Sequence, residues 1–470
     1  MSTEIHEYIQ SQKEELLRIL GELVAIPSVM GEAAPEAPFG EEPKRALLKM
    51  QSFCEEMGFS VTNYDNAVLC ADWQPDLGIE LGILAHLDVV PANENGWDTD
   101  PFSLTEKNGV LYGRGVIDDK GPAAAVLLAL KCVKELGIPL KRGVRLIFGT
   151  NEENGSEDLE IYKDHDQFPP KVFTPDGSFP VINIEKGMLR SRFFSAYGKL
   201  ETFVEGAGGS VAEFHGGKIP NAVPDRAEAV LKDITLAEVQ NAINSDRSGA
   251  AFEASENSGS VVVVCKGKPA HASTPETGIN AVTALISLIN RLPMKELISR
   301  DILRALERFF PHGETDGGAL GLKCSDDSGA LTAVLSVLDM DGSVCCGYID
   351  VRFPTCAKLR DIEEKERYSL ERRANLKLDV ILGDEPHTVP ENSPFVQTLL
   401  SVYENIEGEP GRCLAIGGGT YVHNIEGGVA FGAERGDTDY HMHGDNEFVT
   451  TEELLKDAEL FANVIAKVCG

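Results

Sequence analysis

Apolar residues in the first part of the chain alternate between helical spacing and short continuous runs. Helical spacing, with apolar residues three, four or seven positions apart, predicts helices over 10–24, 44–57 and 122–136. Short apolar runs bounded by polar residues predict buried strands at 82–85, 144–148 and 171–174. This alternation predicts an α/β fold whose mixed, largely parallel sheet is covered by helices on both faces.

The N-terminal segment has the pattern of an amphipathic helix. Acidic residues precede its apolar ones, which recur with helical spacing at Ile5, Ile9, Leu16, Leu20 and Leu23. A secretory signal would begin with basic residues and continue as one apolar stretch. No apolar run in the chain approaches the roughly 18 residues that a membrane span needs. We therefore expect a soluble, cytoplasmic protein without a membrane partner.

The alternating pattern returns near the C-terminus after a long stretch of different character. A helix is predicted over 394–404, an apolar run over 428–431, and a last helix where Thr450 and Glu453 have the spacing of a capping box. Between them, strand-like runs such as SGSVVVVCKG and SVCCGYIDVRF stand beside helical ones such as NAVTALISLINRL. We therefore expect two domains: a discontinuous one from 1–186 and 384–470, and an inserted α+β domain from 187–383.

Charge and cysteine usage narrow the classes of partner. The net charge of -32 argues against nucleic acid or anionic lipid, because both are bound by clustered Lys and Arg that neutralise phosphate. Ten cysteines are scattered along the chain with no CxxC pair. This dispersal indicates reduced thiols in a cytoplasm rather than a disulfide framework or a thiolate zinc site.

Histidines and acidic residues stand where the apolar runs end. GILAHLDVV, VRLIFGTNEE and KVFTPDG pass directly from apolar residues to such side chains, and GRGVIDDKG places two acids before a helix. The candidates are His86, Asp88, Asp118, Asp119, Glu152, Glu153 and Asp176, with His441 and His443 in DTDYHMHGDNEF. The carboxyl ends of strands in an open α/β sheet converge on one site. Carboxylates so close together need a positive partner.

The types of candidate ligand indicate which cation would neutralise these carboxylates. Imidazoles and carboxylates without a thiolate suit zinc, or a harder ion such as manganese. Two ions that share a bridging carboxylate would use the whole set. Taken singly, each residue is more typical of a loop charge or a core histidine. The prediction of a metal site depends on their occurring together at the ends of buried strands.

Several stretches, in order, resemble the cocatalytic zinc exopeptidase family that includes aminoacylases, glutamate carboxypeptidases and dipeptidases. They are HLDVVP followed by GWDTDPF, YGRGVIDDKGP, GTNEENG, TPDGSFPVINIEKG, GKPAHAS and GGGTY. PDGSFPVINIEKG and GGGTY most resemble its bacterial PepV-like dipeptidase branch. The similarity runs from about residue 23 to the last helix, nearly the whole chain.

The resemblance implies a metal centre with two Zn²⁺ per chain, for which Mn²⁺ is an alternative. One ion would be held by His86 and Asp176 and the other by Glu153 and His443, with Asp118 as the bridge between them. We choose His443 because it matches the spacing His-x-x-Asn-Glu, and His441 stays open as the alternative.

The resemblance also implies catalytic roles for two acids beside the ligands. Asp88 would hold the ring of His86 in the required tautomer. Glu152, the neighbour of the ligand Glu153, would be the general base, since an uncoordinated carboxylate can still accept a proton from water.

The inserted domain would be a lid over the metal centre. The resemblance places His271, in GKPAHAS, where it can stabilise the oxyanion. Asn221, in PNAVPD, and Arg352, in YIDVRFP, would hold the C-terminal carboxylate of the substrate. Backbone N–H groups of the GGGTY segment would assist them at Gly418, Gly419 and Thr420. Taken alone, Arg352 also fits a surface ion pair and GGGTY a tight turn.

The first hypothesis is a cytoplasmic metallopeptidase, a dipeptidase that hydrolyses small peptides with a free C-terminus. An N-acyl-amino-acid hydrolase (aminoacylase or deacylase) of the same family is the alternative within this chemistry. A metal-dependent binding protein is a further alternative, although such a protein would have no use for the base Glu152. The predicted lid is much longer than the dimerisation domain of dimeric family members, which implies a monomer.

Overall fold

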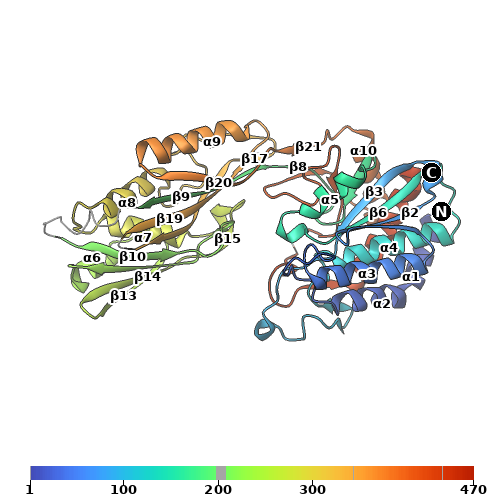
Figure 1. Cartoon of the computed structure of the whole chain (residues 1–470), viewed down its shortest axis with the longest axis horizontal. Helices are drawn as coiled ribbons and strands as arrows, with labels where there is room; N and C mark the ends of the chain where they lie inside the picture. Colours follow the sequence, from blue (N-terminus) through green and yellow to red (C-terminus); the bar gives the residue numbers. More distant parts are fainter. Residues whose placement is uncertain (1, 197–207, 342, 437) are drawn as a thin grey trace. The chain divides into compact units, whose positions relative to one another are not determined.

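The computed structural model of the 470-residue chain describes residues 2–196, 208–341, 343–436 and 438–470. It divides into two compact units (Figure 1). Unit 1 contains Met1–Ile184, Thr388–Leu414 and Gly419–Gly470, and unit 2 contains Glu185–His387 and Ala415–Gly418. Residues 197–207 and 342 of the predicted inserted domain lie outside the described residues.

The short segment Ala415–Gly418 was expected in the first domain but belongs to unit 2. Its backbone explains the difference. The carbonyl of Ile416 accepts a hydrogen bond from the N–H of Lys186 at 3.0 Å, and the carbonyl of Gly417 accepts one from the Arg352 guanidinium at 3.2 Å.

Unit 1 is built on a mixed sheet with parallel strands at its centre. Its strands are β1 (Ser60–Tyr64), β2 (Val68–Trp73), β3 (Ile79–His86), β6 (Gly143–Gly149), β7 (Lys171–Thr174), β8 (Val181–Glu185) and β23 (Val429–Ala430), with β21 (His387–Thr388) and β22 (Cys413–Ile416) beside β8. Their order is β1, β2, β6, β3, β7, β23 and β8. β3 is parallel to β6 and β7, and β7 to β23, whereas β1, β2 and β8 pair antiparallel with their neighbours. The predicted sheet class is confirmed.

Helices cover both faces of this sheet. They are α1 (Ser2–Ser11), α2 (Lys13–Val24), α3 (Glu41–Glu56), α4 (Lys120–Glu135), α5 (Glu157–His165), α10 (Pro394–Glu407) and α11 (Thr451–Cys469), with short 3₁₀ turns η1 (Pro75–Leu77), η2 (Glu94–Gly96) and η3 (Glu152–Asn154). Alternate side chains of β3 enter two separate apolar clusters: Leu81, Ile83 and Ala85 belong to one cluster, and Leu84 belongs to the other. Burial on both faces explains why the parallel strands are continuous apolar runs in the sequence.

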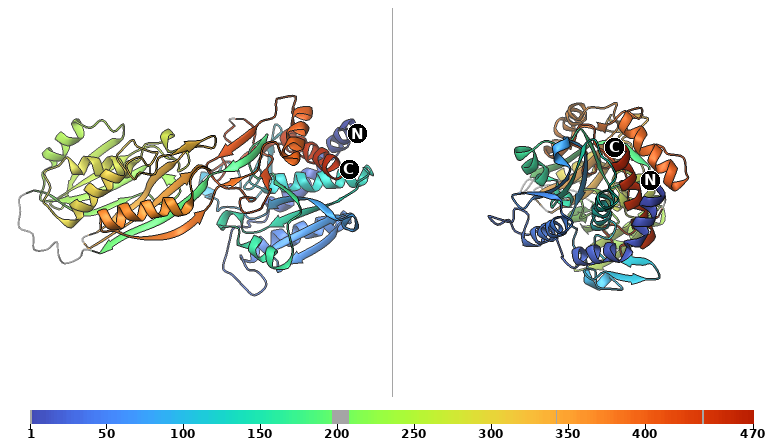
Figure 2. Two further views of the ribbon diagram at one scale, coloured as in Figure 1. Left: turned by 90° about the horizontal axis from the view of Figure 1, so that it is seen from above. Right: turned by 90° about the vertical axis from the view of Figure 1, so that its right-hand side faces the viewer.

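The N-terminal pattern forms two helices rather than one. α1 ends at Ser11, and Gln12 turns the chain before α2, with its N–H bonded to the carbonyl of Ile9 at 2.9 Å. The five apolar residues that predicted the helix are nevertheless fully buried. α1 packs against α4 and α11, so the two ends of the chain lie side by side in unit 1 (Figure 2). A three-stranded sheet of β4 (Thr105–Lys107), β5 (Val110–Tyr112) and β24 (Phe448–Thr450) completes the unit.

Unit 2 is an α+β unit around an antiparallel sheet of eight strands. In sheet order these are β13 (Ala251–Asn257), β14 (Ser260–Lys266), β12 (Arg226–Lys232), β10 (Ser210–Gly216), β18 (Thr332–Met340), β19 (Val344–Phe353), β9 (Gly187–Ala196) and β20 (Lys377–Asp384). Its helices are α6 (Leu236–Asn244), α7 (Ala281–Asn290), α8 (Ile298–Phe309) and α9 (Leu359–Arg367), the last followed by a π-helical turn at Tyr368–Arg373. Two small two-stranded sheets pair β11 (Ala222–Val223) with β15 (Ala270–His271) and β16 (Ser325–Asp326) with β17 (Gly329–Ala330).

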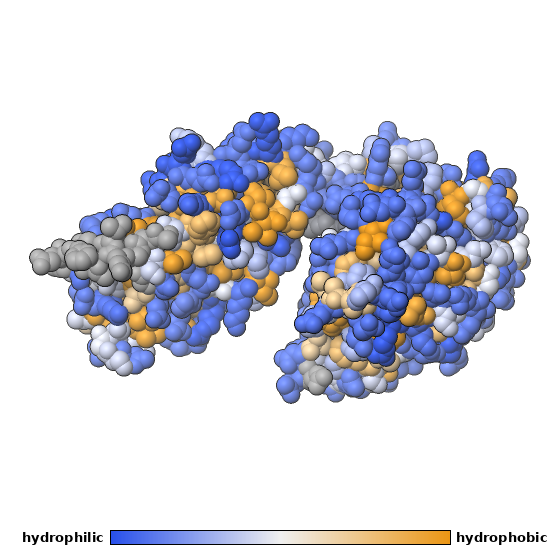
Figure 3. Space-filling model, in the orientation of Figure 1, coloured by the Kyte–Doolittle hydropathy of each residue, from blue (hydrophilic) through white to orange (hydrophobic). Residues whose placement is uncertain are grey.

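The visible surface of each unit is mainly hydrophilic, in keeping with the charge of -32 (Figure 3). An exception lies on β20, an edge strand of unit 2, where Val380, Ile381 and Leu382 are 37%, 52% and 41% exposed.

The capping box predicted at the last helix is present. The Thr450 side chain accepts from the Glu453 N–H, and the Glu453 carboxylate accepts from the Thr450 N–H at 2.8 Å. We expect Thr450→Ala to lower the free energy of unfolding of unit 1 by about 1 kcal/mol, because orphan N–H groups of α11 lose their acceptor. Thermal and urea unfolding measure this loss. Thr235→Ala removes the matching box of α6 in unit 2 and serves as the control. An unchanged stability of Thr450→Ala would contradict the assigned role of the cap.

Candidate metal centre

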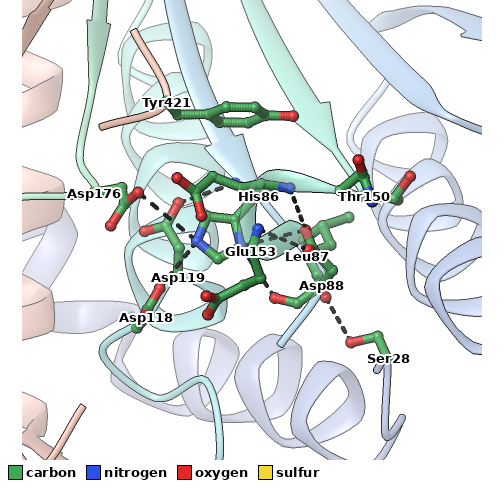
Figure 4. A network of polar contacts seen from close by, with 12 residues as sticks. Ser28, His86, Leu87, Asp88, Asp118, Asp119, Thr150, Glu153, Asp176 and Tyr421 are labelled. Atoms are coloured by element: carbon green, nitrogen blue, oxygen red, sulfur yellow. Dashed lines mark hydrogen bonds and ion pairs between the residues drawn. The ribbon is translucent and has the colours of Figure 1, made fainter. Parts of the chain in front are cut away.

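The ends of three parallel strands bring the candidate residues together. His86 is the last residue of β3 and lies opposite Gly149, the last residue of β6. Glu152 and Glu153 follow β6 in η3, and Asp176 follows β7 by two residues. Asp118 lies in the loop just before α4. Neighbouring parallel strands end at the same edge of the sheet, and the side chains of His86, Asp118, Glu153 and Asp176 lie close together there (Figure 4).

The ligand candidates form two groups that share Asp118. In one group the ligand atoms of His86, Asp118 and Asp176 lie within 4.8 Å of one another, and in the other those of Asp118, Glu153 and His443 do. The Oδ1 atom of Asp118 lies 2.9 Å from His86 Nε2, and its Oδ2 atom lies 2.9 Å from His443 Nε2. His443 Nε2 is also 3.1 Å from the Glu153 carboxylate. Asp118 therefore offers one oxygen to each group, as a bridging carboxylate does.

His443, and not His441, belongs to this cluster. His441 is exposed, and its Nδ1 atom lies 3.2 Å from the carbonyl of Asp445. Its ring packs edge-on against Phe448. The structure thus brings together the five ligands that the resemblance implies: His86, Asp118, Glu153, Asp176 and His443.

The electrostatics of the cluster suit divalent cations. Burial, followed by the charge of Asp118, raises the pKa of Asp176 to about 7, and the same two causes raise the pKa of Glu153. Hydrogen bonds to Asp118 and Glu153 raise the pKa of His443 to about 11. The crowded acids therefore take up protons unless another cation neutralises them. Two ions of charge +2 bound to oxygen and imidazole nitrogen donors meet that need.

Glu152 lies beside this cluster but in neither group of ligands. Burial, followed by the charge of Asp176, raises the pKa of Glu152 well above its ordinary value. Its backbone N–H donates to Asp88 Oδ1 at 3.1 Å, and the N–H of Glu153 donates to Asp88 Oδ2 at 3.1 Å. Asp88 thus holds the turn that carries both glutamates.

The ring of His86 is held mainly by the backbone of Asp88. His86 Nδ1 lies 3.0 Å from the Asp88 carbonyl and 3.5 Å from the Asp88 carboxylate. The carboxylate was expected in this role from the sequence. In the structure that carboxylate accepts the two N–H groups of η3, and the carbonyl is the nearer acceptor for the ring.

Arg114 and Glu447 form a buried ion pair that was not predicted from the sequence. Their side chains are 2% and 0% exposed, and Arg114 Nη1 lies 2.7 Å from Glu447 Oε2. The Glu447 carboxylate also accepts from the N–H groups of Gly115, Ile117 and Asp118 at 3.0, 3.0 and 3.3 Å. Since Glu447 follows His443 by four residues, this pair ties the loop of the bridging ligand to the loop of His443. The only sequence signal was its place in the HGDNEF stretch.

Three further side chains, those of Asp119, Asp158 and Tyr421, support the segments that carry the ligands. Asp119 Oδ2 accepts the N–H of His86 at 3.0 Å. Asp158 Oδ2 accepts the N–H groups of Thr150 and Asn151, which lead into η3, at 2.7 and 3.0 Å. Tyr421 donates to Asp158 at 2.5 Å and sets its ring edge-on to His86 (Figure 4).

The predicted substrate residues of unit 2 lie on adjoining segments of that unit. β15, which ends at His271, pairs with β11, which begins just after Asn221. The N–H of Ala272 donates to the Asn221 carbonyl at 2.9 Å. Thr332 Oγ1 donates to the Ala272 carbonyl at 2.9 Å, and Thr332 faces Arg352 across β18 and β19. Unit 2 therefore gathers these predicted residues into one patch.

Arg352 is buried within a charged cluster. Its Nε and Nη2 atoms donate to Asp350 at 2.6 and 3.2 Å, and Arg190 donates to the same carboxylate at 3.1 Å. The backbone of Gly417 packs closely against Ser273 at this patch. A Cβ atom at position 417 would lie 2.4 Å from the Cβ of Ser273, so only glycine fits there. Gly418 belongs to unit 2, whereas Gly419 and Thr420 belong to unit 1. The chain therefore passes from unit 2 to unit 1 within the GGGTY segment.

Fold and site together define a metal-dependent hydrolase. The chain matches the family model described as Peptidase family M20/M25/M40 over residues 82–467, and it belongs to that family. It is therefore a peptidase, a hydrolase that acts on peptide bonds. Among the helices of the described residues, none combines the length and apolarity that crossing a membrane would require.

Named relatives are similar over nearly the whole chain. The chain is 33% identical over 463 residues to YtjP of Bacillus subtilis, named as a candidate dipeptidase, covering 97% of each protein. It is 32% identical over 477 residues to the Beta-Ala-Xaa dipeptidase of Lactobacillus delbrueckii, covering 99% of this chain and 98% of that protein. The structure of human carnosine dipeptidase 1 aligns with a TM-score of 0.61 at 17% identity, covering 99% and 98% of the two chains. That likeness shows a shared fold.

We expect Glu447→Gln to lower the affinity for divalent cations roughly 10- to 100-fold, as removal of a group that orients metal ligands does. The amide lacks the charge that faces Arg114 and the second acceptor oxygen for the 115–118 loop. Metal content after dialysis against a graded chelator series measures the effect, with circular dichroism as a check of folding. Glu452→Gln, an exposed site on α11, is the control. Equal metal retention by Glu447→Gln and wild type would contradict the expected role.

Proposed function

We propose that the chain is a dipeptidase that hydrolyses small peptides with a free C-terminus, using water activated by two divalent cations. The observation that carries this assignment is the pair of ligand groups that share Asp118, with one Asp118 oxygen facing each histidine. A carboxylate shared in this way would let each ligand group hold one divalent cation, as in two-metal peptidases. Relatives named as dipeptidases support the choice of substrate class.

The ions would lower the pKa of a water molecule and polarise the scissile carbonyl. Glu152 then acts as the general base and accepts a proton from that water. The same carboxyl passes the proton to the nitrogen of the leaving amine. Two features support this role: Glu152 lies outside both ligand groups, and Asp88 fixes its backbone.

We assign the substrate-binding roles to the patch of unit 2 described above. His271 would stabilise the oxyanion; its Nδ1 atom lies 2.7 Å from Ser273 Oγ, so Nε2 is the ring atom assigned to that contact. Asn221 and Arg352 would hold the substrate carboxylate, with backbone N–H groups at Gly418, Gly419 and Thr420. Arg190 and Arg352 share the single carboxylate of Asp350. That cluster therefore keeps one net positive charge, which favours an anionic ligand.

The proposed cofactors are two Zn²⁺ ions, with Mn²⁺ as the alternative, and the proposed state is a cytoplasmic monomer. The donor set of imidazoles and carboxylates supports the metals. All ten cysteines are free thiols and six are buried, which fits a reducing compartment.

Glu152→Gln separates metal binding from chemistry. We expect this variant to keep both metals and to lose about 10³-fold in kcat, because the amide cannot accept the proton of the water. Asp118→Asn should lose metal as well, since it removes the charge that both ligand groups share. Metal analysis and dipeptide turnover on the same preparations distinguish the two variants. Hydrolysis at the wild-type rate by Glu152→Gln would refute its assignment as the base.

A substrate panel tests the proposed function itself. We expect the metal-loaded enzyme to hydrolyse dipeptides with both ends free faster than their N-acetylated forms. Chelation should abolish turnover, and Zn²⁺ or Mn²⁺ should restore it. Release of free amino acids, followed by chromatography, is the measurement. Turnover of the N-acetylated forms alone would instead establish the N-acyl-amino-acid hydrolase.

A further inference from the structure

Glu434 is an acidic residue beside the metal centre with no role in the assignments above. It lies in a segment that follows β23 and runs alongside the chain that leaves β7. The N–H of Glu434 donates to the Gly177 carbonyl at 2.9 Å, and the Glu434 carbonyl accepts from the N–H of Phe179 at 2.9 Å. Gly177 directly follows the ligand Asp176. Backbone hydrogen bonds on both sides therefore hold Glu434 next to a metal ligand.

The close approach of the two segments depends on a glycine. Gly432 has a φ of +99°, and a Cβ atom there would lie 2.5 Å from the ring of Phe179. The backbone of Glu434 is thus placed by packing as well as by hydrogen bonds.

The carboxyl group of Glu434 lies within electrostatic reach of the ligands. Burial, followed by the charge of Asp118, raises the pKa of Glu434, while a hydrogen bond with Ser178 opposes that rise. In turn, the charge of Glu434 contributes to the raised pKa of Asp176. Glu434 belongs to neither ligand group.

The neighbouring cation does not neutralise Glu434. Arg435 points to other acids, with Nη2 at 2.6 Å from Asp457 and 3.2 Å from Glu407. Within the described residues, no Lys, Arg or His forms an ion pair with Glu434. A carboxylate that is partly buried without a cationic partner is costly, unless a ligand supplies the positive charge.

Glu434 adds negative charge close to the ligands without belonging to either ligand group. In a dipeptide, the amino nitrogen is separated from the scissile carbonyl carbon by the α-carbon alone. A group that binds the ammonium must therefore lie beside the metal ligands, where Glu434 is.

We propose that Glu434 binds the free ammonium group of the substrate and so makes the enzyme select dipeptides over N-acylated amino acids. This inference rests on the proposed function. The ammonium would donate a charge-assisted hydrogen bond to the Glu434 carboxylate. An N-acyl group carries no positive charge and would leave that carboxylate unpaired.

Glu434→Gln tests this inference, because it keeps the shape of the side chain and removes its charge. We expect KM for a dipeptide with a free amine to rise roughly 10- to 100-fold, with kcat within a few-fold of wild type. For the matched substrate in which hydrogen replaces the amino group, kcat/KM should change little. The preference for the free amine, a ratio of two kcat/KM values, should therefore fall by the same factor. Glu426→Gln, an exposed acid on the preceding segment, is the control and should keep the wild-type ratio.

Direct binding provides a readout that does not depend on turnover. In the Glu152→Gln background, calorimetry should show weaker dipeptide binding when Glu434→Gln is added, with two metals still bound. Loss of metal from Glu434→Gln would overturn the inference, because the residue would then act through the metal centre. An unchanged ratio of kcat/KM values would overturn it too. If wild type itself fails to hydrolyse dipeptides, the proposed function fails. If wild type succeeds and the ratio is insensitive to Glu434, only the present inference fails.

Discussion

Mutual repulsion of acidic side chains is the constraint on which the rest of unit 1 depends. Parallel strands that are buried on both faces end at one edge of the sheet, and the segments after β6 and β7 bring Glu153 and Asp176 into the same small volume as Asp118, which precedes α4. Negative charges this close are tolerated only when protons, histidines or metal ions neutralise them. Sharing Asp118 limits the number of crowded acids, since one carboxylate faces both histidines.

Other acids give the loops of the centre their shape. Asp88, Asp158 and Glu447 each accept two or more backbone N–H groups from the segments that carry the ligands. Hydrogen bonds from N–H groups to a charged acceptor are among the stronger ones in proteins. Apart from the short 3₁₀ turn η3, the described ligand loops lack regular secondary structure, and these hydrogen bonds hold their backbone. The same carboxylates therefore position the ligands and add negative charge to the site.

Unit 2 meets a different electrostatic requirement. Its patch is built on strands of one antiparallel sheet and on the short β11–β15 pair, and the side chains of Arg190, Asp350 and Arg352 together leave a single positive charge. In the proposed roles, this cluster of unit 2 binds the carboxylate of the substrate, and Glu434 of unit 1 binds its ammonium group.

Local pattern in the sequence was sufficient for most elements and for the acids and the histidine at the strand ends, while the assignment of ligands came from the family resemblance. The apolar runs became β3, β6 and β7, and the acids at their ends converged because parallel strands end together. The choice of His443 over His441 also agrees with its place in the cluster. Only the tertiary structure decided the break at Gln12, the carbonyl that holds His86, and the positions of Glu447, Asp158 and Glu434. Apolar spacing reports which face of an element is buried, whereas these acids resemble any surface charge until distant segments pack against them.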